Sequence, residues 1–203
     1  MRHPVFFTLC IGSVFALQAC QKNSDADVAR AMASVNVIDE TNLSDLMLTV
    51  GDPAEAVAYF LRASTDNPGR IDLKRGLAKS LVRAHKPAEA ATVWAEVMKF
   101  PDVTNADRVD YADALIRMNE WTRAEAELNL IPPTYETYAR YKLEAMVADA
   151  NKDWKRADSF YEIALGLTTR PAGVMNNWGF SKLTRGSYAE AEWLFTDAIR
   201  QDN

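Results

Sequence analysis

A short motif occurs five times along the chain at an almost constant spacing. The alanine that ends each copy stands at position 56, 90, 124, 157 or 191, so the steps are 34, 34, 33 and 34 residues. A large apolar residue follows four positions after each alanine, and a small residue precedes each alanine by twelve. The large residues are Phe60, Trp94, Leu128, Tyr161 and Phe195, and the small ones are Ser44, Ala78, Ala112, Ala145 and Gly179. A fixed period of this size predicts a repeat architecture.

The spacing resembles the tetratricopeptide repeat, in which each unit is a helix, a turn and a second helix. Two helices cross closely only where both carry small side chains, and a large side chain one turn later fills the neighbouring gap. The last copy matches the pattern best, with Trp178-Gly179, Gly186, Tyr188 and Ala191. We therefore predict an all-α solenoid of about five helix-turn-helix repeats over residues 37–203. The expected units are residues 37–70, 71–104, 105–137, 138–171 and 172–203.

Three short stretches predict where helices begin and end inside these units. In Gly51-Asp52-Pro53 the aspartate suits the cap of a helix and the proline its first position. Asn105-Ala106-Asp107 predicts the cap of the third unit. Pro132-Pro133 predicts an early end to that unit's second helix, because proline cannot continue a helix.

The start of the chain has the features of a processing segment. An apolar run from Val5 to Leu17 is too short to span a bilayer comfortably and ends in Leu17-Gln18-Ala19-Cys20. This ending resembles a bacterial lipobox, which implies a lipoprotein signal peptide at 1–19 and lipid attachment at Cys20. Residues 20–36 then form a tether from the membrane. The alternative is an ordinary secretory signal whose cleavage site happens to precede a cysteine.

Composition and motifs give little support for catalysis. The net charge of −5 and the absence of a strong basic run argue against nucleic-acid binding. His85 is the one histidine beyond the signal segment, and it falls at an expected helix-helix turn. No metal-binding, phosphate-binding or nucleophile motif is present. We therefore expect no catalytic residue, metal, cofactor or small-molecule substrate.

A basic stripe is expected on the inner face of the solenoid, the face that binds peptides in repeat proteins. Arg75, Lys79 and Arg83 are four residues apart and share one helix face, and the period continues the stripe with Arg117 and Lys142. Such a stripe would suit an acidic segment or a C-terminal carboxylate of a partner. The alternative is a solvated charged face.

Two asparagines and the last helix add further candidate contacts. Asn42 and Asn177 hold the same place in the first and fifth units, where an amide can bind a peptide backbone or a neighbouring helix. The last helix carries Trp193, Leu194, Phe195 and Ile199, which cannot all face one neighbour. That helix either caps the solenoid or docks on another protein.

Several features together are similar to the TadD lipoproteins of tight-adherence (Flp) pilus assembly systems. They are the lipobox, the compact size, the stretch Asp72-Leu73-Lys74-Arg75-Gly76 and the stretch Asn176-Asn177-Trp178-Gly179. The resemblance implies a scaffold on the periplasmic face of the bacterial outer membrane. Its partner would be a secretin or another pilus-assembly component, and Gln21 after the cysteine fits outer-membrane sorting. Two alternatives are a lipoprotein of β-barrel assembly or a pilotin of type IV pili, and an adaptor that regulates a periplasmic peptidoglycan hydrolase.

Overall fold

A computed structural model describes residues 42–202 of the chain. The chain divides into two compact units, Met1–Thr49 and Val50–Asn203, and each is described by itself. In the first unit, residues 42–49 are helical.

Several predictions concern residues outside this part. The expected signal peptide (1–19), the lipidated Cys20 and its linker (20–36), and residues 37–41 of the expected first repeat are not among the described residues. The expected first repeat, 37–70, also crosses the division between the two units, so its two helices are described separately.

The second unit is built from helices joined by short turns, and residues 42–202 contain no strand. The helices are α2 (Pro53–Asp66), α3 (Ile71–Arg83), α4 (Pro87–Val97), α5 (Asn105–Arg117), α6 (Trp121–Asn129), α7 (Tyr138–Ala150), α8 (Trp154–Gly166), α9 (Ala172–Thr184) and α10 (Tyr188–Asp202). The prediction of an all-α chain is confirmed for this part.

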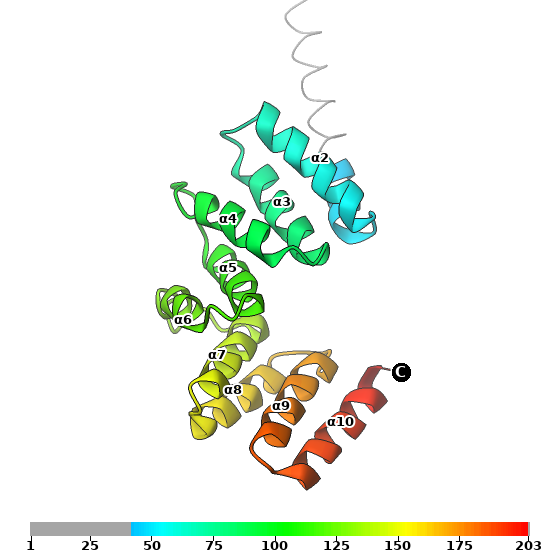
Figure 1. Cartoon of the computed structure of the whole chain (residues 1–203), viewed down its shortest axis with the longest axis vertical. Coiled ribbons are helices and arrows are strands. Elements are labelled where there is room, and N and C mark those ends of the chain that lie inside the picture. Colours follow the sequence, from blue (N-terminus) through cyan, green and yellow to red (C-terminus); the bar gives the residue numbers. More distant parts are fainter. Residues whose placement is uncertain (1–41, 203) are drawn as a thin grey trace, which may run out of the picture. The chain divides into compact units, whose positions relative to one another are not determined.

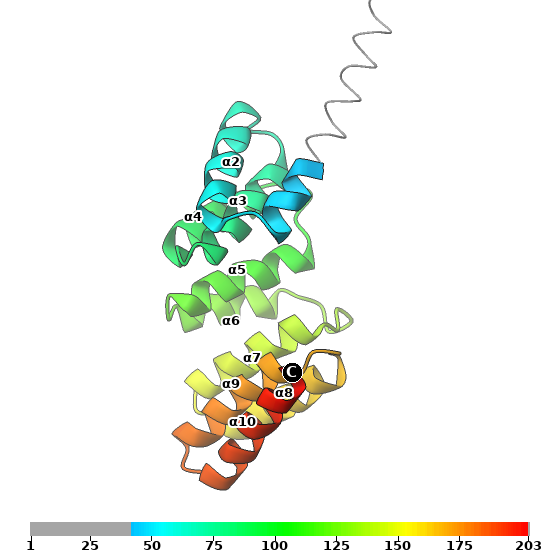
Figure 2. The same ribbon diagram turned by 90° about the vertical axis from the view of Figure 1, so that its right-hand side faces the viewer.

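Each helix of the second unit packs against its neighbours along the chain. The helices α3 and α4, α5 and α6, α7 and α8, and α9 and α10 form antiparallel pairs, and the pairs follow one another in sequence order (Figures 1 and 2). The second helix of each pair also contacts the first helix of the next pair. This nearest-neighbour stacking is the architecture of an α-solenoid.

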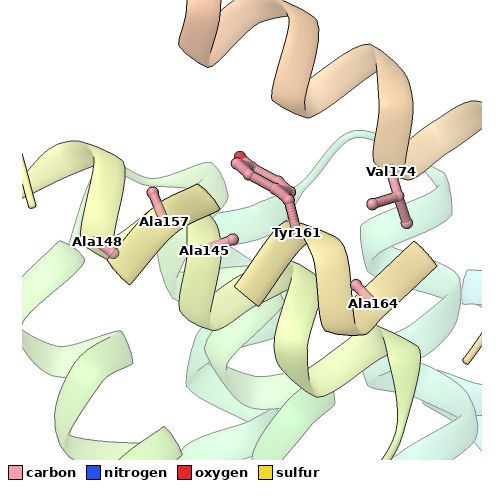
Figure 3. Packing of buried hydrophobic residues seen from close by; sticks show 6 residues of the cluster. All are labelled: Ala145, Ala148, Ala157, Tyr161, Ala164 and Val174. Atoms are coloured by element: carbon pink, nitrogen blue, oxygen red, sulfur yellow. The ribbon is translucent and has the colours of Figure 1, made fainter. Parts of the chain in front are cut away.

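The repeated alanines lie in the core where the helices cross. Ala90, Ala124 and Ala157 have no exposed surface, and the large residue that follows each of them is also buried. Figure 3 shows one such cluster, with Tyr161 between small residues of α7 and α8. Its buried members are Ala145, Ala148, Ala157, Tyr161, Ala164 and Val174. The small residues let the helix backbones approach, and the ring fills the space between them.

The turn inside each helix pair has the same backbone geometry in all four pairs. The second residue after the first helix adopts a left-handed conformation, with φ of 57° at His85, 59° at Asn119, 60° at Lys152 and 83° at Gly186. In each turn the next N–H reaches back to a carbonyl of the preceding helix, as from Lys86 to Leu81 at 2.9 Å. This hydrogen-bonded helix ending satisfies carbonyls that the helix leaves unpaired.

The expected helix boundaries are partly confirmed and partly corrected. Asp52 caps α2 by accepting hydrogen bonds from the backbone N–H groups of Ala54 and Glu55, as predicted. The prediction that α5 is capped within 105–107 is wrong. Thr104 is the cap, and Asp107 completes a reciprocal capping box with it.

The connection between α6 and α7 departs from the short turns elsewhere. The helix α6 ends at Asn129, before Pro132-Pro133, and is the shortest of the helices α2 to α10. The buried Arg140 on α7 donates to the carbonyls of Pro132 and Tyr135 at 2.8 and 3.2 Å, and it pairs with Glu144. One guanidinium therefore holds this connection against α7.

Candidate functional site

The first helices of the pairs form one continuous surface. Contacts join α3 to α5, α5 to α7 and α7 to α9, whereas their partner helices contact only helices of their own or the next pair. Side chains from four consecutive repeats therefore lie on a shared face, which we call the inner face.

The basic stripe lies on this face, but its cations already have acceptors. Arg75 binds both carboxylate oxygens of Asp107 at 2.7 Å, and Lys79 lies 3.3 Å from Asp110. Because α3 provides the cations and α5 the carboxylates, these pairs join two repeats.

The remaining basic residues of the stripe differ in their contacts. Arg83 donates to the carbonyl of Gly51 at 2.8 Å, and Arg117 pairs with Asp113 one turn back on α5 at 2.7 Å. Lys142 is half-buried on α7. The stripe is therefore largely neutralised by the chain itself.

The two aspartates opposite α3 are perturbed in opposite directions. Burial alone would raise the pKa of Asp107, but hydrogen bonds from Arg75 and Thr104 outweigh it and hold that pKa below its usual range. For Asp110, burial dominates over the attraction of Lys79 and raises the pKa. The Arg75–Asp107 pair is thus the stronger electrostatic link between these repeats.

The two asparagines are not brought together. Asn177 lies on α9, and its amide contacts the sulfur of Met146 at 3.4 Å. Asn42 is exposed in the helical segment 42–49 of the first unit. Asn177 therefore belongs to the inner face, and Asn42 is not placed relative to it.

A pocket of about 460 Å³ opens on the inner face between α7 and α9. Its apolar lining is Trp121, Met146, Ala150, Trp154, Tyr161, Phe180 and Phe195. Its polar lining is Asp149, Lys152, Asn176, Asn177, Ser181 and Thr184. The volume and the mixture of apolar walls with a few polar groups are typical of ligand-binding sites.

Asp149 is the acidic residue of this pocket. It accepts hydrogen bonds from the Tyr161 hydroxyl at 2.9 Å and from the Ser181 hydroxyl at 2.6 Å. Burial raises the pKa of Asp149, and these two hydrogen bonds only partly offset that effect. Burial and the nearby Asp149 charge raise the pKa of Tyr161 as well, so its hydroxyl stays protonated and donates.

A second acidic residue, Asp158 on α8, has a different role. It accepts from the Trp178 indole N–H at 2.6 Å, from Lys182 at 3.2 Å and from Arg185. Burial alone would raise the pKa of Asp158, but these three donors hold it below its usual range. Asp158 therefore fastens α8 to the α9 region, with its charge fully compensated.

The exposed aromatic residues of the last pair lie on different faces. Phe180 lines the pocket with 60% of its surface exposed, whereas Trp193 on α10, also 60% exposed, is not part of the lining. Trp193 stands two positions after the motif alanine of its repeat. The residues at the same position of the earlier motifs are all exposed, and they are Ala58, Thr92, Ala126 and Ser159. Trp193 therefore stands at a position that faces solvent in every repeat of the second unit.

Sequence reasoning missed the pocket because it searched the inner face for charge. The same period that placed Lys142 on α7 places Met146 one turn later, and Phe180 at the matching position of α9. These apolar residues on a face expected to be solvated were the available signal.

Neither a metal-binding cluster nor a membrane-spanning helix is present in the part of the chain that the structure describes. Between residues 42 and 202, no three histidine, cysteine, aspartate or glutamate side chains are grouped to hold a metal ion. None of the helices in this range combines the length and the apolar character that a membrane crossing needs.

Comparisons with known proteins identify the fold. No protein-family model matches the chain, and no curated protein matches its sequence. Solved structures of several proteins resemble it, with low sequence identity. A MamA fragment from Desulfovibrio magneticus RS-1 aligns with a TM-score of 0.63 and 16% identity over 80% of this chain and 92% of its own.

Two other similar structures are the Cut9–Hcn1 complex and YrrB. The Cut9–Hcn1 complex aligns with a TM-score of 0.68 and 18% identity over 78% of this chain and 32% of the matched chain. YrrB is described as a TPR protein with an unusual peptide-binding site. It aligns with a TM-score of 0.57 and 14% identity over 79% of this chain and 83% of its own. Together with the period and the helix pairs, these likenesses show that residues 50–202 have the fold of a tetratricopeptide-repeat α-solenoid.

Proposed function

We propose that this protein is a non-enzymatic scaffold that binds partner proteins through the inner face of its solenoid. The observation that carries the proposal is the pocket between α7 and α9, where the exposed Phe180 stands among apolar walls and a few polar groups. Solenoids use extended inner surfaces of this kind to bind other proteins. YrrB, which has a similar fold, is described as having an unusual peptide-binding site, and this supports peptide binding as a use of the fold.

We further infer that Cys20 anchors the scaffold to the periplasmic face of the outer membrane. The support is the Leu17-Gln18-Ala19-Cys20 sequence and the polar stretch that follows it. The partner would then be a secretin or another component of a tight-adherence pilus machine.

The anchor is tested by metabolic labelling with palmitate in a bacterial host. The full chain should incorporate the label and fractionate with the outer membrane, and Cys20→Ser should do neither, because the thiol is the site of acylation. Equal labelling of both proteins would remove the anchor from the proposal.

The binding role is tested by co-purification from detergent-solubilised envelopes of a strain that assembles tight-adherence pili. Phe180→Ala removes an aromatic ring from the pocket, whereas Trp193→Ala removes an equally exposed ring elsewhere. The wild type and Trp193→Ala should recover the secretin or a pilus-assembly protein, and Phe180→Ala should lose it. Recovery that depends on Trp193 instead, or that neither change affects, would contradict the proposal.

A further inference from the structure

We propose that the pocket between α7 and α9 binds the side chain of an arginine or lysine that a partner protein presents on an extended segment. The inference rests on the scaffold function proposed above and names the chemistry of what the pocket takes. The proposed partner segment is basic, whereas the basic stripe in the sequence predicted an acidic one.

The aromatic lining favours a cation. Trp121, Trp154 and Phe180 line the pocket, and the faces of aromatic rings attract ammonium and guanidinium groups. The chain uses the same contact close by. The Arg185 guanidinium lies 5.7 Å from the ring centre of Trp154. The Arg156 guanidinium lies 5.2 Å from the ring centre of Phe160. The apolar stem of a lysine or arginine would also cover the side chain of Met146.

Asp149 supplies the negative charge that such a side chain needs. Its two hydrogen-bond donors, Tyr161 and Ser181, are neutral hydroxyls. Within residues 42–202 no lysine or arginine forms an ion pair with it, and Arg185, whose charge also attracts it, is paired with Asp158. Asp107, Asp110 and Asp158 each have an ion-paired cation. A partly desolvated carboxylate without an ion-paired cation is costly to keep, and a partner's cation would stabilise it.

Two other occupants fit the same surface less well. An acidic segment would find Arg75, Lys79 and Arg117 already paired with Asp107, Asp110 and Asp113, and in the pocket it would face Asp149. A purely apolar side chain would fill the pocket but would bury Asp149 further without any counter-charge. Both occupants are outcomes of the test below.

Lys152 is the other charged residue of the pocket. Its side chain is exposed at the turn between α7 and α8. Its ammonium group partly cancels the field of Asp149 that an incoming cation would feel. The proposal therefore expects Lys152→Ala to raise the affinity for a cationic peptide.

The test uses NMR titration of the full chain without its signal segment, with the tryptophan indole N–H signals as reporters. Trp121 and Trp154 line the pocket, and the buried Trp94 lies on α4 and serves as an internal control. The probes are four short capped peptides that differ at one position, which holds arginine, citrulline, norleucine or glutamate. Citrulline keeps the shape of arginine and removes its charge.

The arginine peptide should shift the signals of Trp121 and Trp154 and leave Trp94 unchanged. The citrulline and norleucine peptides should bind at least about tenfold more weakly, because a hydrogen bond to a charged group is lost. Asp149→Asn should abolish the difference between arginine and citrulline without changing the fold. Equal binding of all four peptides, preference for glutamate, or no shift with any peptide would overturn the proposal.

The two proposals can fail separately. If Phe180→Ala loses the envelope partner but arginine has no advantage over citrulline, the scaffold function stands and the cation-binding inference falls. If the arginine preference is found but no pilus-assembly protein is recovered, the pocket chemistry stands and the assigned partner is wrong.

Discussion

Gly179 and Gly173 lie on the same helix in opposite surroundings. A Cβ on Gly179 would stand 2.8 Å from a ring carbon of Phe195, whereas a Cβ on Gly173 would meet nothing within 4 Å. The first glycine is therefore required by packing against α10, and the second is not.

We expect these two glycines to respond with opposite signs to the same substitution. Gly179→Ala should lower the free energy of unfolding by about 1–3 kcal/mol, the usual result of overpacking. Gly173→Ala should raise it by about 0.4–1 kcal/mol, because alanine restricts the unfolded chain and favours the helix. Urea titration of both variants checks the signs, and a stable Gly179→Ala protein would mean that the ring of Phe195 moves aside freely.

Asp107 makes a contribution to stability that depends on pH. Its pKa is lowered in the folded protein, so its ion pair is fully present above the ordinary aspartate value of about 4. The contribution is lost as the pH falls through the lowered pKa. Asp107→Asn should cost about 2 kcal/mol at pH 7. Thermal unfolding of both proteins at a series of pH values measures this difference in stability. The difference should stay constant down to about pH 4 and shrink below it. A cost that does not change with pH would contradict the assignment.

Asp149 should behave in the opposite way. Its pKa is raised in the folded protein, so wild-type stability falls as the pH rises from about 4 through the raised pKa. Asp149→Asn does not lose stability in this way, because its amide does not ionise. The variant should therefore be more stable than the wild type at pH 7. The advantage should vanish in acid, and thermal unfolding at several pH values measures it. A variant that is less stable at every pH would show that the charge is compensated within the chain.

At the scale of the helix pair, one turn geometry serves four repeats with four different residues. His85, Asn119 and Lys152 occupy a left-handed conformation that only Gly186 adopts without strain. The recurrence of this geometry shows that the packing of the pair determines the turn, whatever residue stands there.

The cost of that geometry can be measured by exchanging the residues. His85→Gly should raise the free energy of unfolding by about 0.5–1 kcal/mol, because relief of the strained backbone exceeds the added flexibility of the unfolded chain. Gly186→Ala should lower it by about 1–2 kcal/mol. Chemical denaturation of the His85→Gly and Gly186→Ala proteins measures both effects. Effects of equal sign would show that the turns relax into another conformation.

The sequence predicted the helices well because their signals are local and repeated. The alanines of the motif, Asp52 as a cap and the proline end of α6 all follow from spacing or from the chemistry of one residue. The cap at Thr104 was missed because Asp107 takes part in two structures at once, the capping box and the Arg75 pair. That second contact depends on how two repeats are aligned in space.

The site was harder to predict, since its character comes from contacts between repeats. Arg75 and Lys79 were correctly expected to share a face, but their aspartate partners lie about one repeat later in sequence and reach them only through the packing of α3 on α5. The pocket likewise needs α7 and α9 side by side and the tryptophans of two other helices. No single motif marks such a site.

At the scale of the 50–202 solenoid, the inner face divides into two parts with different chemistry. Around α3 and α5 the basic and acidic residues form ion pairs, and around α7 and α9 a largely apolar pocket contains Asp149, which has no ion-paired cation among residues 42–202. We therefore propose that the first part contributes stability and that the second part binds the partner.

The central claim is that the pocket between α7 and α9 is where the partner lies, and site-specific photo-crosslinking in living cells tests it most directly. A photoreactive residue would replace Phe180 in one strain and Trp193 in another. We predict a crosslink from position 180 to a secretin or pilus-assembly protein, abolished by Asp149→Asn, and none from position 193. A crosslink to that protein from position 193 but not from position 180 would contradict the account.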